Sequence, residues 1–325
     1  MKFSVDGWDP GYGQAFDVDE LADTVAQVDA TIEVSTANWA PLAPVAGLPT
    51  PSAVLFVDGV RRIDARVWID DGTSGGERAV VGICASYAAG AVCCCGQGAH
   101  TLSGEVRRGL FTTAASATHI HTEAAWFTLH RLLGNGPSPT AQALSNALQR
   151  ALADLELTAA VHARAAAATH GVGEDDLVVV DGPLHGRAQL PRTIGYVKTH
   201  HAQYLPADLN AVVAALRTGQ HTPVFVIGTG WERYSWYLRL PALAGGPWTG
   251  IVRIEAPPLL DLTEVVTLAN MTQLLLGRFA SVEYKDGRAP QNLFPIAGLE
   301  RDLRHQLGDA ALVYRALRSS SVATR

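Results

Sequence analysis

The sequence predicts an α/β fold in which a mixed sheet is flanked by helices. Two apolar runs, VLFVDG at 54–59 and LVVVDG at 177–182, each end on an Asp-Gly pair, and a helical pattern lies between them at 140–170. Consecutive apolar residues rich in Val are typical of strands buried on both faces. A Gly directly after the Asp favours a sharp turn. We therefore expect Asp58 and Asp181 at the C-terminal ends of buried strands, where open α/β sheets bind their ligands.

The composition is that of a folded protein with a sizeable core. The chain has 325 residues, of which 48% are hydrophobic and 17% charged, enough for one large or two modest domains. We recognise no signal peptide and no apolar run of the roughly 18 residues that a membrane helix needs, so we expect a cytoplasmic protein. The net charge of −6 argues against a general nucleic-acid binder, but it is compatible with a nuclease whose carboxylates bind metal ions.

The first part of the chain predicts an extension and then three strands in succession. Residues 1–50 contain turn residues and a short acidic helix around 17–28, and they end in a Pro-rich linker. The strands are expected at 54–59, 62–70 and 78–86, and the turn residues at 70–76 connect the second to the third.

Residues 87–139 are predicted to be an insertion. We expect a strand near Glu105 and a helix at 122–134, ended by Gly and Pro. The run Cys93-Cys94-Cys95, with Cys84 upstream, lacks the C-x2-C spacing of zinc sites. The cysteines are expected to be reduced thiols, mostly buried in a strand of small residues, with a metal or redox site as the alternative.

A long helix is predicted from about Thr140 to His170. At roughly 100° per residue, Glu156 lies on the edge of its apolar stripe and Asp154 points into water. The stripe itself is formed by Leu144, Leu148, Leu152, Leu155 and Ala159. The elements expected after it are strands at 177–182, 193–198, 223–228, 235–240 and 250–256, helices at 206–218 and 263–277, a short strand near Val282, and a helix from Pro295.

Three strands, a helix and a strand ending in Asp follow the order of a ribonuclease H-like fold. In that fold an Asp of the first strand, a Glu of the first helix and an Asp of the fourth strand converge, and these places fall on Asp58, Glu156 and Asp181. Three crowded carboxylates repel one another unless a cation neutralises them. Mg²⁺ and Mn²⁺ prefer such hard oxygen ligands. A pair of such ions can activate water and stabilise the leaving oxygen of a phosphodiester.

An ordered set of motifs in the second half resembles the NurA family of nucleases. The motifs are LVVVDGPL (177–184), GYVKT (195–199), RYSWYLRL (233–240), GIVRIE (250–255) and NLFPIAGLERD (292–302). The resemblance runs with gaps from about Ser52 to His305. It implies a DNA nuclease that acts in DNA end processing and repair together with a HerA-type hexameric ATPase, and that uses Mn²⁺ or Mg²⁺.

The resemblance also implies roles for single residues. Asp58 and Asp181 match the family's two metal-binding aspartates, and Glu156 best matches the helical glutamate, with Glu123 as its competitor. The last metal ligand of the family falls on Asp302, with Glu300 as a rival. In the family both Asp-Gly pairs usually precede Ser, whereas Val60 and Pro183 stand here, so a hydroxyl that helps to position the substrate is missing.

Further residues are candidates for contact with DNA. Lys198 fills the place of a family lysine near the site, where it would contact phosphate or pair with a site carboxylate. Arg233 and Tyr237 would contact the DNA backbone or stack on a base, and the alternative is an aromatic-rich core strand. His119 and His121 form an H-x-H pair that lacks a third ligand nearby in the sequence, and His200-His201 would point to opposite faces of a strand.

Other functions stay open from the sequence. Actin-like and sugar-kinase folds share the strand order, and VIGTGW (226–231) offers a weak G-x-G phosphate turn. A catalytically inactive NurA-like subunit that docks on its ATPase is the non-enzymatic alternative. We expect an extension at 1–50, a nuclease domain at 51–310 and a tail at 311–325. We also expect a homodimer that binds single-stranded DNA or DNA ends.

Overall fold

The chain folds into two compact units, each assembled from segments that are distant in the sequence. The structure is a computed structural model that describes residues 22–23, 26–71, 79–133, 140–169, 171–173, 175–200, 202–228, 230–242 and 245–323. Unit 1 comprises 1–56, 93–99 and 168–298, and unit 2 comprises 57–92, 100–167 and 299–325.

Unit 1 is built on a mixed sheet. Strands β8 and β9 are parallel, and the other pairings from β9 to β2 are antiparallel. In spatial order the strands are β2 (Gln27–Asp29), β11 (Phe225–Gly228), β12 (Glu232–Arg239), β13 (Ile251–Ala256), β9 (Thr193–Val197), β8 (Leu177–Asp181) and the first residues of β3 (Ala53–Asp70). A separate parallel pair is formed by β1 (Ala22–Asp23) and β10 (Ala202–Gln203).

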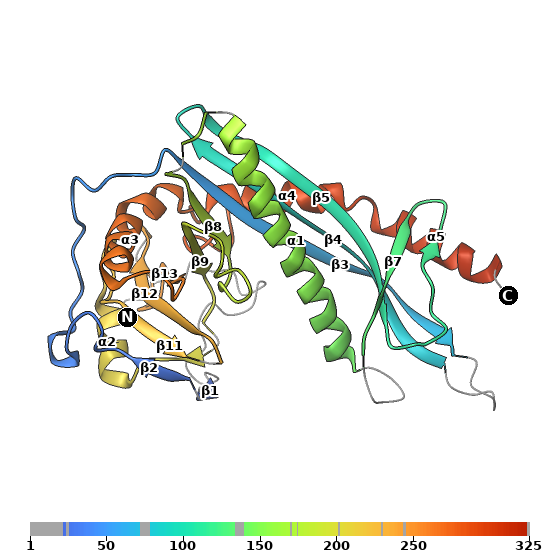
Figure 1. The fold of residues 1–325 in the computed structure, drawn as a ribbon, viewed down its shortest axis with the longest axis horizontal. Helices are drawn as coiled ribbons and strands as arrows, with labels where there is room; N and C mark the ends of the chain where they lie inside the picture. The colour runs from blue at the N-terminus through green and yellow to red at the C-terminus, as the bar shows by residue number, and fades with distance from the viewer. Residues whose placement is uncertain are drawn as a thin grey trace, which may run out of the picture. The chain divides into compact units, whose positions relative to one another are not determined.

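Helices pack on both faces of the unit 1 sheet (Figure 1). Alternate residues of β12 point to opposite faces. Trp236 lies in a core with residues of α3 (Leu262–Leu275), whereas Tyr237 lies in a second core with residues of α2 (Ala207–Ala215). Two short 3-10 helices, Thr36–Asn38 and Leu276–Phe279, also lie in this unit.

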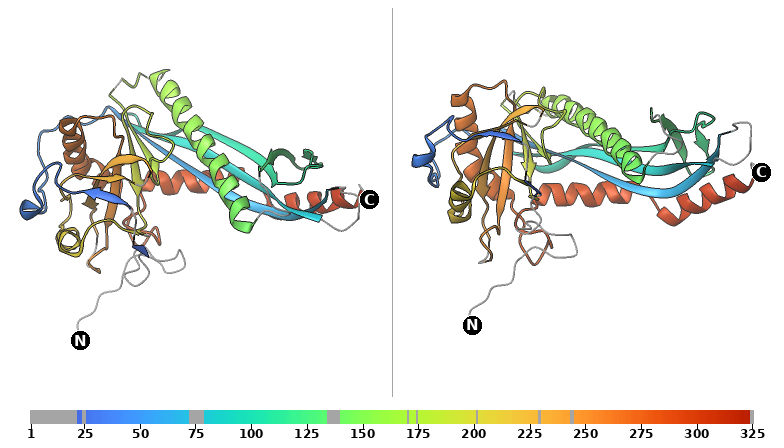
Figure 2. Two further views of the ribbon diagram at one scale, coloured as in Figure 1. Left: turned by 60° about the horizontal axis from the view of Figure 1, so that its bottom comes forward. Right: turned by 90° about the horizontal axis from the view of Figure 1, so that it is seen from below.

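Unit 2 is built on long strands that are covered by helices. Its sheet runs from β3 to β4 (Ala79–Cys95), β5 (Gly98–Thr112), β7 (Trp126–Arg131) and β6 (Ile120–His121). Helix α1 (Ala141–Thr169) lies on one face of these strands, and α5 (Ala310–Ala323) lies on the other (Figure 2). Val313 and Leu317 of α5 share a core with Val80 and Leu110 of the strands. Helix α4 (Phe294–Gln306) precedes α5.

The predicted long helix is confirmed as α1. Its whole apolar stripe from Leu144 to Ala159 is buried. Glu156, at the edge of that stripe, is also buried, and Asp154 is exposed as expected.

The first Asp-Gly pair does not end a strand. The two strands predicted at 54–59 and 62–70 are one strand of 18 residues, β3, which continues through Gly59. The turn expected after the second pair is confirmed, because Gly182 follows β8 with a φ of 103°. The chain therefore turns at one of the two pairs and stays extended at the other.

Three further predictions about elements are wrong in the described residues. The stretch 122–134 contains strand β7 and no helix, because its apolar residues contribute to the sheet edge. Around 17–28 the described residues include β1 and β2 and no helix. Near Val282 there is an isolated bridge at Ala280 in place of a strand. Helix α5 covers most of the stretch 311–325, which is predicted as a tail, and it ends at Ala323.

The predicted fold class is confirmed: the chain is α/β, with a large mixed sheet flanked by helices. The region 87–139, predicted as an insertion, supplies the rest of β4 and strands β5, β6 and β7. Most of the turn predicted at 70–76 lies outside the described residues. The division into 1–50, 51–310 and 311–325 stays a prediction. None of the described helices combines the length and the hydropathy that crossing a bilayer requires.

Candidate functional site

Two of the predicted metal ligands lie close together in unit 2. Asp58 is 7% exposed on β3, and its Oδ1 accepts a hydrogen bond of 2.7 Å from the backbone N–H of Gly59. Glu156 is 5% exposed on α1. Both predicted ligands are therefore buried, one on strand β3 and one on helix α1.

Gly59 allows helix α1 to approach strand β3 closely. A Cβ at position 59 would lie 2.5 Å from Oε1 of Glu156 and 2.6 Å from Cδ1 of Leu152. The Glu156 carboxylate therefore packs against the backbone of the residue that follows Asp58. The glycine that the sequence suggests for a turn serves instead for this close approach of helix α1 to strand β3.

Asp181 and Lys198 form an ion pair in unit 1. Nζ of Lys198 lies 2.6 Å from Oδ2 of Asp181 and donates to Oδ1 of Asn292 at 3.1 Å. Nδ2 of Asn292 in turn donates to Oδ2 of Asp286 at 2.6 Å. The two charged side chains of the pair are 15% and 14% exposed. Of the two roles expected for Lys198, the structure shows the pairing with a site carboxylate.

The environment of Asp181 is rigid and partly apolar. The N–H of Gly182 donates to the carbonyl of Tyr196 at 2.8 Å, which fixes the turn that carries Asp181. Burial raises the pKa of Tyr196 well above its usual value, and the charge of Asp181 adds to the effect. Tyr196 is therefore neutral, and its hydroxyl donates to the carbonyl of Gln291 at 2.6 Å.

The rival acids differ in burial. Asp302 is exposed on α4, whereas the Glu300 side chain is 14% exposed and its Oε1 accepts a 2.8 Å hydrogen bond from Arg304. Glu123, the competitor of Glu156, is exposed in a bend between β6 and β7. Burial therefore favours Glu156 over Glu123, and Glu300 over Asp302, as members of a buried site.

Tyr237 and Arg233 do not behave as surface contacts. Tyr237 is 2% exposed and belongs to a core cluster, as the core-strand alternative expects, so no contact with DNA is assigned to it. Arg233 is 4% exposed, and its Nε donates to Oε1 of Glu255 at 2.8 Å. Nη1 of Arg253 donates to the same oxygen at 2.7 Å. The sequence reading missed Glu255, although an acid in the apolar strand GIVRIEA signals a buried charge that needs a partner.

Comparison with known proteins gives a structural likeness. No family model matches the sequence, and no curated protein matches it. The chain is similar to the crystal structure of the NurA nuclease from Sulfolobus solfataricus, with 12% sequence identity and a TM-score of 0.44, over 86% of this chain and 88% of that one.

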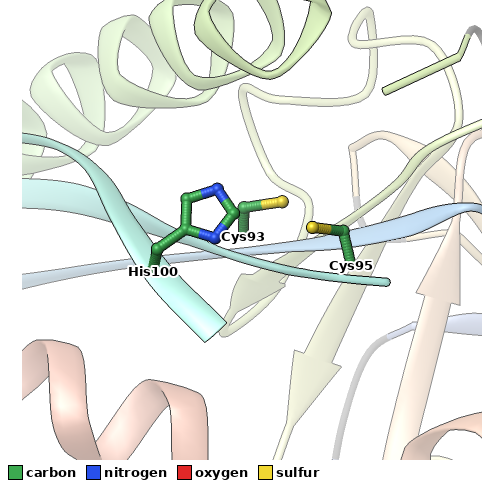
Figure 3. A group of neighbouring side chains, drawn as sticks. All are labelled: Cys93, Cys95 and His100. Atoms are coloured by element: carbon green, nitrogen blue, oxygen red, sulfur yellow. The ribbon is translucent and has the colours of Figure 1, made fainter. Parts of the chain in front are cut away.

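A second group of potential metal ligands lies at the turn between β4 and β5. Three ligand atoms lie within 4.8 Å of one another, one from each of Cys93, Cys95 and His100. Figure 3 shows the sulfur atoms of the two cysteines pointing toward each other. Thiolates and imidazole suit Zn²⁺ rather than Mn²⁺ or Mg²⁺, so this group differs in chemistry from the carboxylates.

The thiols of Cys93 and Cys94 are protonated at neutral pH. Burial, followed by the neighbouring Cys95, raises the pKa of Cys93 to about 12. Burial also raises the pKa of Cys94 to about 11. Because a metal binds the thiolate, an ion here would have to displace these protons. The four cysteines are free, and Cys84 and Cys93 are buried, as the sequence predicts.

The histidines considered in the sequence have local partners. Nδ1 of His119 accepts the N–H of Leu129 at 3.1 Å, and the rings of His119 and His121 both lie near Trp126. His200 is buried and its Nε2 lies 3.2 Å from the carbonyl of Ile251. His201 lies outside the described residues.

Proposed function

We propose that the protein is a metal-dependent DNA nuclease that hydrolyses phosphodiester bonds in DNA end processing or repair. Its Mn²⁺ or Mg²⁺ ligands are Asp58, Glu156 and Asp181, as the sequence resemblance implies. The sequence predicts Asp302 as the last ligand. Glu300 is less exposed than Asp302, and this makes Glu300 the stronger candidate.

The observation that carries the proposal is the packing of Glu156 against the Asp58-Gly59 backbone. The close approach brings a buried acid of helix α1 to the strand that carries a second buried acid. Oxygen donors from these two elements would suit hard divalent ions. Such a set is costly to a protein without a function for it.

Asp181 and Lys198 supply a complementary pair of charges. The ammonium holds the Asp181 carboxylate in one orientation, and Asn292 holds the ammonium. A cation of this kind attracts the phosphate of a DNA strand, and its hydrogen bonds restrict where that phosphate binds. One or two bound metal ions would supply the activation of water and the stabilisation of the leaving oxygen.

The direct test is cleavage by the purified chain. Single-stranded DNA should be degraded when Mn²⁺ or Mg²⁺ is added, and the activity should disappear in chelator and return with excess metal. Cleavage that persists in chelator would contradict the metal role. Hydrolysis of ATP or phosphorylation of a sugar by the isolated chain would favour the kinase-like alternative, and a chain that binds its partner without any cleavage would favour the inactive subunit.

We also propose a HerA-type hexameric ATPase and a homodimer of this chain as its assembly. The net charge of −6 gives little non-specific affinity for duplex DNA, because that affinity comes mainly from neutralised phosphates. The sequence also lacks a G-x4-G-K-[ST] loop with which to unwind a duplex. An ATPase partner that delivers single strands would supply both the affinity for DNA and the unwinding.

The expected result is ATP-dependent degradation of blunt duplex DNA by the mixture of nuclease and ATPase, and by neither protein alone. Co-purification of the two proteins and the mass of the nuclease in solution test the assembly. Efficient digestion of long duplex DNA by the chain alone at physiological salt, with no binding to such an ATPase, would refute this part of the proposal.

A further inference from the structure

Unit 1 contains a pocket directly after the Asp181-Gly182 turn. Its volume is about 420 Å³, and Pro183 forms part of its wall. The opposite wall is built by side chains of β12 and β13, and further residues come from the segment after β9. This volume lies at the lower end of the roughly 300–1,000 Å³ of small-ligand sites, so the pocket fits one small group and not a duplex.

The pocket is lined by two guanidinium groups and one carboxylate. Glu255 is fully buried, and its Oε1 accepts hydrogen bonds from Arg233 at 2.8 Å and from Arg253 at 2.7 Å. Its Oε2 accepts the N–H of Leu184 at 2.9 Å. Glu255 thus fixes both guanidinium groups and ties them to the chain that follows Asp181. With two cations and one anion among the lining residues, the pocket favours an anionic ligand such as a phosphate.

Aromatic rings lie beside these cations. The guanidinium carbon of Arg233 is 4.7 Å from the ring centroid of Trp231, and that of Arg253 is 4.8 Å from the ring centroid of Tyr204. The His185 ring meets the Trp231 ring edge to face, with centroids 5.8 Å apart. Both Trp231 and Tyr204 are partly exposed. Rings that are held by packing and still open to solvent are suitable for stacking on a planar base.

We propose that this pocket binds one nucleotide of a single DNA strand, next to the phosphate that is cleaved. The base stacks on Trp231, and its phosphate faces Arg233 and Arg253. The inference rests on the proposed nuclease function for the identity of the ligand. A base within a duplex is already stacked on its neighbours and is not accessible to such a pocket, so the pocket selects single strands.

The pocket can be tested by the fluorescence anisotropy of a labelled oligothymidylate that binds to the protein. Chelator is present, so that the strand cannot be cut. Trp231→Ala should weaken binding about tenfold, because one base stack is lost, and Trp231→Phe should recover most of the affinity. Trp68→Ala is the matched control, since Trp68 is 65% exposed on β3 and does not line the pocket. Its affinity should equal that of the unchanged protein.

A strand with abasic sites separates stacking from loss of structure. Trp231→Ala should bind the abasic strand as well as the unchanged protein does, because there is no base to stack. Equal affinity of both proteins for the normal strand would overturn the pocket proposal. A thymidine mononucleotide that binds as tightly as the oligonucleotide would overturn the assignment to a strand and identify a free nucleotide as the ligand.

The two proposals fail in different ways. If Trp231→Ala loses binding and the unchanged protein shows no metal-dependent cleavage, the pocket proposal stands and the nuclease proposal fails. If the unchanged protein cleaves DNA with metal and Trp231→Ala binds as tightly as it does, the nuclease proposal stands and the pocket proposal fails.

Discussion

Replacement of Asp58 or Asp181 by Asn is expected to abolish metal-dependent DNA cleavage and to leave the fold intact. Asn keeps the shape of the side chain and removes the charge that a divalent ion requires. The amide oxygen of Asn at position 58 can still accept a hydrogen bond from the N–H of Gly59. In the unchanged protein this N–H lies 2.7 Å from Oδ1 of Asp58. Loss of a direct ligand should exceed the roughly 10–100-fold effect of changing a residue that supports a ligand. Single-turnover cleavage of single-stranded DNA with Mn²⁺ measures the loss.

Asp181→Asn tests the same role in unit 1, where a charge partner is present. The substitution removes the ion pair with Lys198, but Nζ of Lys198 keeps its hydrogen bond to Asn292. The side chains of the pair are only 15% and 14% exposed, so the cost in the free energy of unfolding should be about 1–3 kcal/mol. Thermal unfolding distinguishes this cost from a loss of structure.

Asp154→Asn is the matched control for both variants. Asp154 is an exposed acid on α1, the helix that carries Glu156. Its charge faces solvent, so cleavage should proceed at the rate of the unchanged protein. Full activity in both Asp58→Asn and Asp181→Asn would mean that the two Asp-Gly pairs have no part in metal binding.

The sequence predicts those elements whose patterns arise from burial alone. The Val-rich run of β8 is buried on both faces, and the leucine stripe of α1 repeats at helical spacing over many turns. Both patterns are long or uniform enough to exclude the alternative structure. The position of Glu156 at the edge of the stripe follows from the same periodicity, and it is this position that brings the acid to β3.

Short segments were predicted less well because their structure depends on neighbours far away in the sequence. The stretch around Trp126 and Phe127 has apolar residues that fit either period, and its pairing with β5 decides for a strand. Gly59 is compatible with a turn or with a close approach, and Leu152 and Glu156 on a distant helix decide between them. The partners of Lys198 are equally remote, since Asn292 lies 94 residues further along the chain.

Glu156→Gln is expected to abolish cleavage, whereas Glu123→Gln should not affect it. Gln preserves the length and the helix propensity of the side chain, so the variant tests the charge of a buried acid that packs against Gly59. Glu123 is exposed outside the helices and serves as the matched acid. Cleavage rates with Mn²⁺ and the metal concentration at half-maximal rate are the measurements. Loss of activity in Glu123→Gln and not in Glu156→Gln would reverse the assignment of the helical ligand.

The same prediction can be tested through the backbone, without removing any acid. In Gly59→Ala the new methyl would lie 2.5 Å from Oε1 of Glu156 and 2.6 Å from Cδ1 of Leu152. The Glu156 carboxylate should turn away from the new methyl group, and the metal concentration required for cleavage should rise. Gly298→Ala is the control, since a Cβ at Gly298 on α4 meets nothing within 4 Å. If Gly59→Ala needs no more metal than Gly298→Ala, the approach of α1 to β3 does not build the metal site.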